Sequence, residues 1–314
     1  TGAARALGDW HGLRSVSATR SGEVIALVDG SRQLHLIRPD VEPEDFPGEI
    51  DFAGFATDTQ LVIAAANGVI DVYNVADRRR ELLVTGRSRL LGVAWGRGHH
   101  PWIAAAFSDG TLWRKNLVTG TSANIARSPR IDPARPTVRD SKLLVSADGT
   151  VTFLHDQTVH AWSANGQLAR LATAPKPLDD LGEAGTGAVI VFASDSTTYT
   201  LGRDPPSALT EALPALDATS AAMSPDTGLL VALEHGAIEV LDPSAKQHWT
   251  LAQPTGVTFD NLALSADGRR VVAGTPRGLV TWTISLPASA IATAAWLETM
   301  TNAVDDGQPG LGWR

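Results

Sequence analysis

The stretch that decides the fold is NLALSADGRRVVAGTPRGLVTWTI, which runs from Asn261 to Ile284. It reads as an apolar strand, a Ser-Ala-Asp-Gly turn, a second apolar strand, another tight turn and a third strand. Runs of this kind, bounded by Gly, Asp and Pro, are typical of short strands joined by hairpins. The segment therefore predicts a unit built only from strands and turns.

The same pattern occurs seven times, with about forty residues between copies. Clear examples are SAAMSPDTGLLVALEHGAIEVLD (Ser220–Asp242) and LGVAWGRGHHPWIAAAFSDGTLWRKN (Leu91–Asn116). The third strands of the copies align at Ile37, Tyr73, Lys115, Trp162, Leu201, Leu241 and Thr283. Strand-only repeats of this period indicate a β-propeller. We therefore expect an all-β fold, a seven-bladed β-propeller of four-stranded antiparallel blades.

The two ends of the chain are expected to complete the ring. Residues 1–11 would hold a closing strand, with Ala3–Leu7 as the fourth strand of the last blade, which would remove an exposed edge. The propeller would span residues 12–285, and residues 286–314 would form a short C-terminal helix and a tail. The helix is predicted because apolar residues recur every three or four positions, at Ile291, Ala294, Leu297, Met300 and Val304.

Composition excludes several classes of partner and chemistry. The net charge of −8 over 314 residues repels nucleic-acid and anionic-lipid phosphates, so neither partner is expected. The sequence has no cysteine, which excludes disulfides, thiolate metal sites and a cysteine nucleophile. No apolar run is long enough to span a bilayer and no signal peptide is recognised, so we expect a cytoplasmic protein. Because the first residue is Thr1 and not Met, we expect a processed product or the C-terminal piece of a longer protein.

The segments SADGRRVVAG, GLVTW and SPDTGLLVALEHGAIEVLD resemble the blade consensus of WD-repeat propellers, and the resemblance covers essentially the whole chain. The copies are degenerate: none has a clean Gly-His before its first strand or Trp-Asp in its third, and Trp162-Ser163 and Leu241-Asp242 come nearest. The tail LPASAIATAAWLETMTNA resembles those that close bacterial WD-repeat segments appended to kinases, proteases or NTPases. That resemblance implies a C-terminal sensing, docking or regulatory scaffold in a larger bacterial signalling or defence protein.

A search for catalytic and ligand-binding motifs finds none. There is no Gly-x-Ser-x-Gly or Walker motif, and the glycines of Gly182–Gly187 precede a strand, so no helix terminus could hold phosphate. His155 and His160 flank a hairpin without a third metal ligand. The acidic group Asp179, Asp180 and Glu183 lacks the spacing of a calcium loop. We predict no catalytic residue, metal or cofactor, and no enzymatic activity in this chain.

The predicted function is binding of a protein or peptide, possibly a domain of the same parent protein. The expected surface carries the loops between blades and the turns between second and third strands. It includes Trp10, His11, Arg87, Arg89, Asp156, Asp179, Asp217, His235 and Arg277. Trp10 is the preferred aromatic anchor, and arginines would pair with carboxylates of an acidic peptide. The alternative is a propeller hydrolase or lyase with its site over the central channel. The small, apolar first strands, such as GVAW, argue against it.

Overall fold

The computed structural model describes twenty segments of the chain. They are residues 5–7, 14–19, 22–38, 41–85, 88–96, 102–126, 143–155, 157–183, 189–193, 198–201, 209–213, 218–224, 229–242, 247–251, 256–259, 261–265, 268–276, 278–284, 303–304 and 312–313.

Six blades are each built from four consecutive antiparallel strands. Blade 1 comprises β2 (Ser15–Ala18), β3 (Ile25–Val28), β4 (Leu34–Arg38) and β5 (Val41–Phe46). Blade 2 comprises β6 (Ile50–Phe55), β7 (Gln60–Ala65), β8 (Ile70–Asn74) and β9 (Arg79–Val84). Blade 3 comprises β10 (Leu90–Trp95), β11 (Trp102–Phe107), β12 (Thr111–Asn116) and β13 (Ser122–Ala126). Blade 4 comprises β14 (Leu143–Val145), β15 (Val151–His155), β16 (Thr158–Trp162) and β17 (Leu168–Thr173). Blade 5 comprises β18 (Leu178–Glu183), β19 (Val189–Ala193), β20 (Thr198–Leu201) and β21 (Leu209–Leu213). Blade 6 comprises β22 (Ala218–Met223), β23 (Leu230–Glu234), β24 (Ala237–Asp242) and β25 (Gln247–Thr250).

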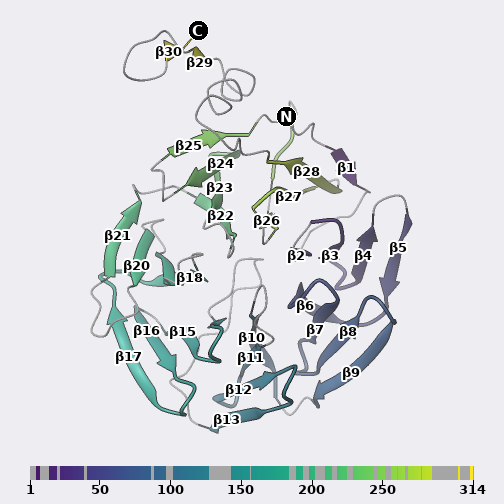
Figure 1. Cartoon of the computed structure of the whole chain (residues 1–314), viewed down its shortest axis with the longest axis vertical. Coiled ribbons are helices and arrows are strands. Elements are labelled where there is room, and N and C mark those ends of the chain that lie inside the picture. Colours follow the sequence, from purple (N-terminus) through teal and green to yellow (C-terminus); the bar gives the residue numbers. More distant parts are fainter. Residues whose placement is uncertain are drawn as a thin grey trace.

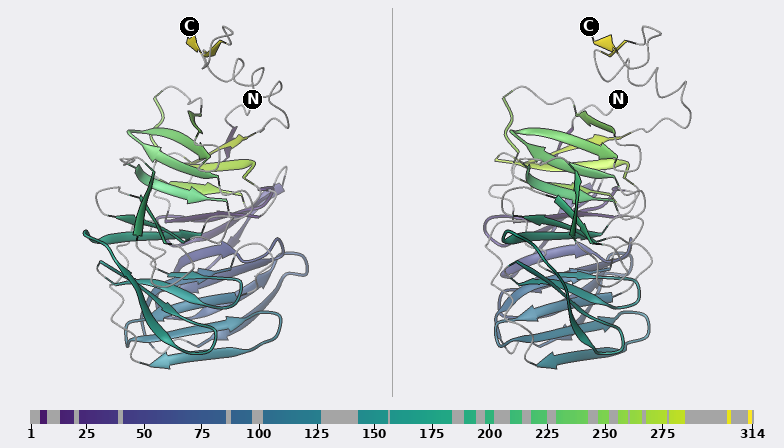
Figure 2. Two further views of the ribbon diagram at one scale, coloured as in Figure 1. Left: turned by 60° about the vertical axis from the view of Figure 1, so that its left-hand side comes forward. Right: turned by 90° about the vertical axis from the view of Figure 1, so that its left-hand side faces the viewer.

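The remaining four-stranded sheet joins the two ends of the chain. Its strands run in the order β1 (Arg5–Leu7), β28 (Gly278–Thr283), β27 (Arg270–Thr275) and β26 (Asn261–Leu264), so its outermost strand comes from the N-terminal segment. Arg5 lies opposite Thr281, and Leu7 lies opposite Leu279. Figure 1 shows the sheets arranged around a central axis, with β1 beside β28, and Figure 2 shows the same ring from the side.

The predicted fold, a seven-bladed propeller with a C-terminal helix, was wrong as stated and needs correction at the chain ends. Only six blades are uninterrupted, because the closing sheet is assembled from both ends. The described residues contain no α-helix, and none that could cross a membrane. Val304, expected on the helix, lies in β29 (Ala303–Val304), which pairs with β30 (Gly312–Trp313). Val is β-branched and favours strands. Asp, Gly and Pro between the two strands favour a turn. The other predicted helical positions, Ile291, Ala294, Leu297 and Met300, lie outside the described residues.

The core lies between blades. In β11, Ile103 and Ala104 are fully buried, as expected for a short apolar run with both faces covered. Ala104 belongs to an apolar cluster that also contains Phe153 and Trp162 of the next blade. Each blade therefore buries its faces against its neighbours, which is why the repeats are stable only as a ring.

Gly54 shows how closely adjacent blades approach. A Cβ atom at this position would lie 1.7 Å from the indole ring of Trp95 in the next blade. A side chain of any size would displace that ring. Gly54 in blade 2 is therefore required for the packing of Trp95 in blade 3.

Candidate protein-binding face

The antiparallel order of the strands separates the connections into two groups. In each four-stranded blade the turns after the first and third strands lie at one end. The turn after the second strand and the connection to the next blade lie at the other end. The end that carries the turn after the second strand and the connection to the next blade is called the connection face. The end that carries the turns after the first and third strands is called the opposite face. The connection face is the one on which the sequence places the binding residues.

The structure describes three of the nine predicted binding residues at least in part. Arg89 is exposed on the connection before β10, where its carbonyl accepts a hydrogen bond of 2.8 Å from the Ser108 N–H. His235 is exposed in the turn between β23 and β24. Its φ of 49° and the 82° of Gly236 are those of a tight hairpin.

Asp179 was expected on a loop between blades. It lies instead in β18, the first strand of blade 5, as do the neighbouring acids Asp180 and Glu183. The remaining predicted residues lie outside the described residues, and their role stays a prediction. They are Trp10, His11, Arg87, Asp156, Asp217 and Arg277.

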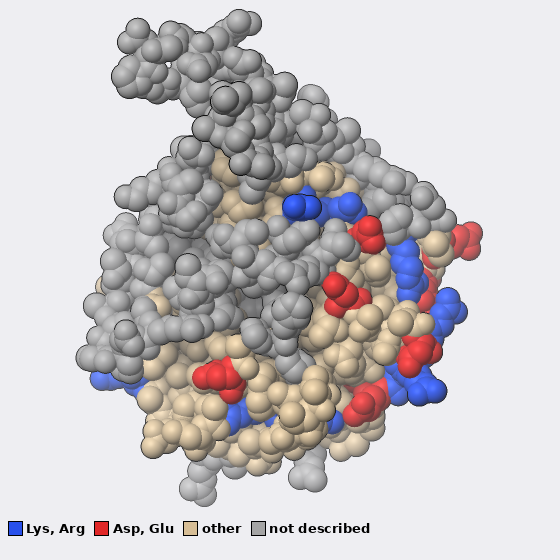
Figure 3. Space-filling view, viewed as in Figure 1, with Lys and Arg blue, Asp and Glu red and all other residues tan. Residues whose placement is uncertain are grey.

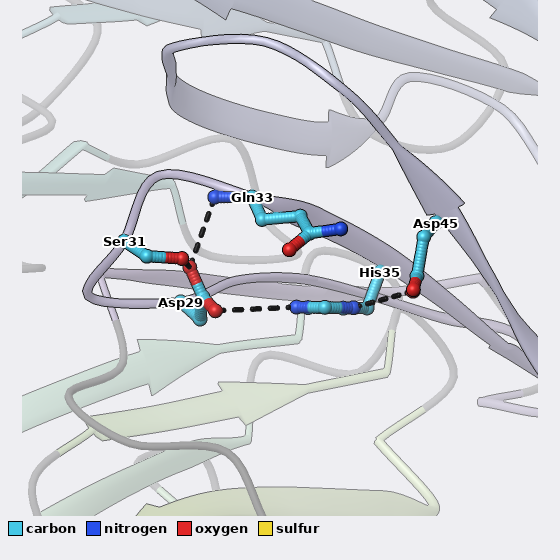
Figure 4. Close-up of polar contacts among 5 residues, drawn as sticks. All are labelled: Asp29, Ser31, Gln33, His35 and Asp45. Atoms are coloured by element: carbon cyan, nitrogen blue, oxygen red, sulfur yellow. Dashed lines mark hydrogen bonds and ion pairs between the residues drawn. The ribbon is translucent and has the colours of Figure 1, made fainter.

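A histidine held between two carboxylates occupies the connection-face end of blade 1. His35 is buried, with its Nδ1 atom 2.7 Å from Asp45 and its Nε2 atom 3.4 Å from Asp29 (Figure 4). Asp29 also accepts hydrogen bonds from the Gln33 N–H at 2.9 Å and the Ser31 hydroxyl at 2.7 Å. Burial tends to raise the pKa of Asp29, but the hydrogen bonds from Ser31, Gln33 and His35 hold that pKa below its ordinary value. The sequence analysis missed His35, because its partners are identified only by strand pairing.

Arginines on the same face join blade 1 to blade 2. Arg14 and Arg32 both lie 3.3 Å from Asp51 at the start of β6, and Arg32 is also 3.6 Å from Glu49. Two cations therefore converge on one half-buried carboxylate. Such pairs orient the turn of blade 1 on its neighbour and balance charge locally.

Charged side chains of both signs also gather on the outer rim over β5 and β9, as Figure 3 shows. Glu44 receives a 2.8 Å hydrogen bond from the Tyr73 hydroxyl of the next blade and a 3.1 Å bond from Arg38. Burial would raise the pKa of Glu44, but these donors keep it below its ordinary value. On β9, Arg80 pairs with the buried Asp71 at 2.6 Å. Glu44 thus links blade 1 to Tyr73 of blade 2, whereas Arg80 and Asp71 compensate each other within blade 2.

A hollow of about 350 Å³ lies at the connection-face end of blade 4. His155, Gln157, Thr158, Thr173 and Pro177 line it. The Nδ1 atom of His155 is buried and has no hydrogen-bond partner within the described part of the chain. Gln157 and Thr173 are exposed.

His160 lies in β16, two residues after Thr158 of the hollow. Its ring stacks on Phe153 at a centroid distance of 5.2 Å and lies 6.4 Å from the ring of His155. Burial lowers the pKa of His160, and the positive charges of His155 and Arg170 lower it further. Among the described residues no three His, Cys, Asp or Glu side chains converge to hold a metal ion.

No protein-family model matches the sequence, and no curated protein matches it. Solved structures match over nearly the whole chain. A chain in the crystal structure of the mitotic checkpoint complex is 14% identical, with a TM-score of 0.66, and the match covers 90% of this chain and 91% of that one. The Cps50 (Swd1) β-propeller domain of Myceliophteria thermophila is 13% identical, with a TM-score of 0.64 and coverages of 90% and 98%. The RRP9 WD40 repeats are 12% identical, with a TM-score of 0.68 and coverages of 89% and 96%. At these identities the likeness concerns the fold, and the chain has the fold of a WD-repeat β-propeller.

Proposed function

We propose that this chain is a non-catalytic protein-binding propeller that receives a protein or peptide on its connection face. The observation that carries the proposal is the contrast between the blade 4 hollow and the polar groups at the same face of blades 1 and 2. Asp29 is hydrogen-bonded and Asp51 is ion-paired to Arg14 and Arg32, although Nε of Arg14 and Oδ1 of Asp51 are buried without a hydrogen bond among the described residues. The polar side chains of the blade 4 hollow have no ion pair or hydrogen bond among the described residues, and two of them, Gln157 and Thr173, are exposed to a second molecule.

Two further observations favour binding over catalysis. First strands such as β10, with the sequence LLGVAW, present small or apolar side chains where a channel enzyme needs acids, histidines or metal ligands. β18 is an exception because it carries three acids. One similar structure is a chain of the mitotic checkpoint complex, and its presence in a complex favours an interaction role for this fold.

A finer proposal concerns the context of the chain. The resemblance of the tail 286–303 to those of bacterial WD-repeat modules supports a docking or regulatory role inside a larger cytoplasmic signalling or defence protein. In that case the partner on the connection face is another domain of the same parent protein. Sequencing the gene upstream of Thr1 tests this directly, and a protease, kinase or NTPase domain encoded there is the expected result.

Site-specific photocrosslinking tests the binding face. A photoreactive amino acid is introduced singly at Asn67, Arg89 or His235, which are exposed on the connection face. Control positions on the opposite face are Thr59, Val118 and Asn165, which are also exposed. Illumination in cells should give one discrete protein adduct from the first set and none from the second. Equal adducts from both sets, or none from the connection face, would refute the proposed function.

A further inference from the structure

Three polar side chains of the blade 4 hollow form a row across neighbouring strands. His155 at the end of β15 lies opposite Thr158 of β16, and Thr158 lies opposite Thr173 of β17. Residues directly opposite each other in antiparallel strands place their side chains on the same side of the sheet, about 5 Å apart. The fold therefore sets an imidazole and two hydroxyl groups side by side, and Gln157 in the adjacent turn adds an amide.

None of these four side chains has a hydrogen bond within the part of the chain that the structure describes. The clearest case is Nδ1 of His155, which is buried and lacks a partner. Seven buried side-chain atoms of the described residues lack a hydrogen-bond partner, and Nδ1 of His155 is the one among them whose side chain lines this hollow. Because Thr173 and Gln157 are exposed, a bound group can enter from solvent.

The chemistry of the row favours an anion. The imidazole, both hydroxyls and the amide can each donate a hydrogen bond toward the hollow. Burial lowers the pKa of the neighbouring His160, and the positive charges of His155 and Arg170 lower it further, so both side chains contribute positive potential at that ring. Within the described segments the lining includes no arginine or lysine, which phosphate sites use for their higher charge. A singly charged carboxylate fits this set of donors better than a phosphate.

We propose that the hollow formed by His155, Gln157, Thr158 and Thr173 binds the carboxylate of an aspartate or glutamate side chain of the docked protein. This inference rests on the proposed function and names the kind of residue that the connection face recognises. One acidic side chain of the partner would enter the hollow, accept hydrogen bonds from the imidazole and the hydroxyls, and fix the register of docking on blade 4.

Histidine-detected NMR on the intact chain tests the proposal. The ring nitrogens of His155 and His160 are followed while N-acetylated, C-amidated glutamate is added, and the same titration is run with the glutamine analogue and with inorganic phosphate. We expect saturable shifts of the His155 ring with the glutamate probe at millimolar concentrations, where one small ligand binds with about −4 kcal/mol. The glutamine analogue should leave the ring signals unchanged.

Variants identify the donors. His155→Ala should abolish the response at His160, and Thr158→Val and Thr173→Val should each weaken binding of the glutamate probe about tenfold, the loss expected for one hydrogen bond to a charged group. Thr283→Val is the matched control, because Thr283 is an exposed strand residue at the opposite face. The threonine variants keep the side-chain shape, so they test the proposal even if His155→Ala fails to fold.

Several outcomes would overturn the carboxylate assignment. Equal shifts with the glutamine analogue would show that charge is not recognised, and stronger shifts with phosphate would assign the hollow to a different anion. An unchanged affinity in both threonine variants would remove the row from the site. These failures are separable from failure of the proposed function, since crosslinks at Asn67, Arg89 and His235 do not depend on this hollow.

Discussion

The two ends of blade 4 differ in how their polar groups are hydrogen-bonded. At the opposite face, Arg114 from β12 of blade 3 is buried and donates to the carbonyls of Gly149 at 2.7 Å, Ser163 at 2.9 Å and Ala164 at 2.9 Å. At the connection face, His155 has a buried ring nitrogen with no hydrogen bond to the described residues. One end thus uses backbone carbonyls to hold Arg114 of the neighbouring blade, although Nε1 of Trp162 there is also buried without a hydrogen-bond partner among the described residues. The other end has unpartnered polar side chains that line a hollow.

Aromatic rings complete the opposite-face end of blade 4. The guanidinium carbon of Arg114 lies 4.1 Å from the ring centroid of Trp162 and 5.9 Å from that of Trp102. Burial lowers the pKa of Arg114 and the charge of Asp148 opposes that change, but a guanidinium remains protonated at neutral pH. The cation is therefore neutralised by carbonyl dipoles and ring faces in a junction that has no direct ion pair to Arg114 among the described residues.

Removing Arg114 from the opposite-face end of blade 4 should have the largest effect on the free energy of unfolding. Arg114→Ala removes a buried cation that donates to three carbonyls, of which that of the buried Gly149 loses its hydrogen bond of 2.7 Å, so we expect a loss of about 3 kcal/mol or more in the free energy of unfolding. Arg114→Lys should lose about half as much, because a lysine cannot reach all three carbonyls. Urea unfolding followed by tryptophan fluorescence measures both.

The control for this prediction is Arg79→Ala. The side chain of Arg79 is 86% exposed, so its removal should change the free energy of unfolding by no more than about 0.5 kcal/mol. A similar loss for Arg79→Ala and Arg114→Ala would show that the buried cation has no special role at the blade 3–4 junction.

Two glycines in turns at the opposite-face end of blade 4 separate the cost of backbone strain from the cost of a steric clash. Gly149 and Gly166 have φ angles of +83° and +90°. A Cβ at Gly149 would lie 2.8 Å from the Trp102 ring, whereas nothing lies within 4 Å at Gly166. We expect Gly166→Ala to cost about 1 kcal/mol from the left-handed backbone alone, and Gly149→Ala to cost about 1–3 kcal/mol more. Equal losses would mean that Trp102 moves aside freely.

Blade 1 supplies the partnered counterpart to the connection-face end of blade 4, because His35 and Asp29 lie at the equivalent end. Asp29→Asn should lower the free energy of unfolding by about 1 kcal/mol at pH 7. Since the pKa of Asp29 is lowered in the folded state, this stabilisation is present above the ordinary aspartate pKa of about 3.9 and is lost as pH falls through the folded pKa. The difference between wild type and variant should therefore shrink below about pH 4. A constant difference from pH 3 to 8 would contradict this account.

Much of the fold could be predicted from the sequence, because a blade is a local object. Segments such as LVALEHGAIEVL carry both strands and the turn glycine in a dozen neighbouring residues, and β23 and β24 form there. The C-terminal helix was wrong because periodic apolar residues near Val304 do not distinguish a helix from a strand over so short a segment.

The candidate site was less accessible to prediction, because it depends on register and on contacts between distant residues. Arg114 reads as an ordinary polar position of a strand, yet its partners lie 35 to 50 residues away. His155 and His160 could be singled out as a hairpin pair, but Thr173 joins them only through the pairing of β16 with β17. Residues with conspicuous chemistry, such as Arg89, were chosen instead.

The smallest expected change in stability comes from the connection-face end of blade 4. Thr158→Val and Thr173→Val remove hydroxyls that have no hydrogen bond to the described residues and replace them with a side chain of the same shape. We therefore expect the free energy of unfolding to change by no more than about 0.5 kcal/mol in either variant. Thr275→Val is the contrasting variant, because the buried Thr275 hydroxyl donates to the Gly278 carbonyl at 3.0 Å and its loss should cost about 1–2 kcal/mol. If the blade 4 variants lose as much as Thr275→Val, their hydroxyls stabilise the fold, and the two ends of blade 4 no longer differ in the way that binding requires.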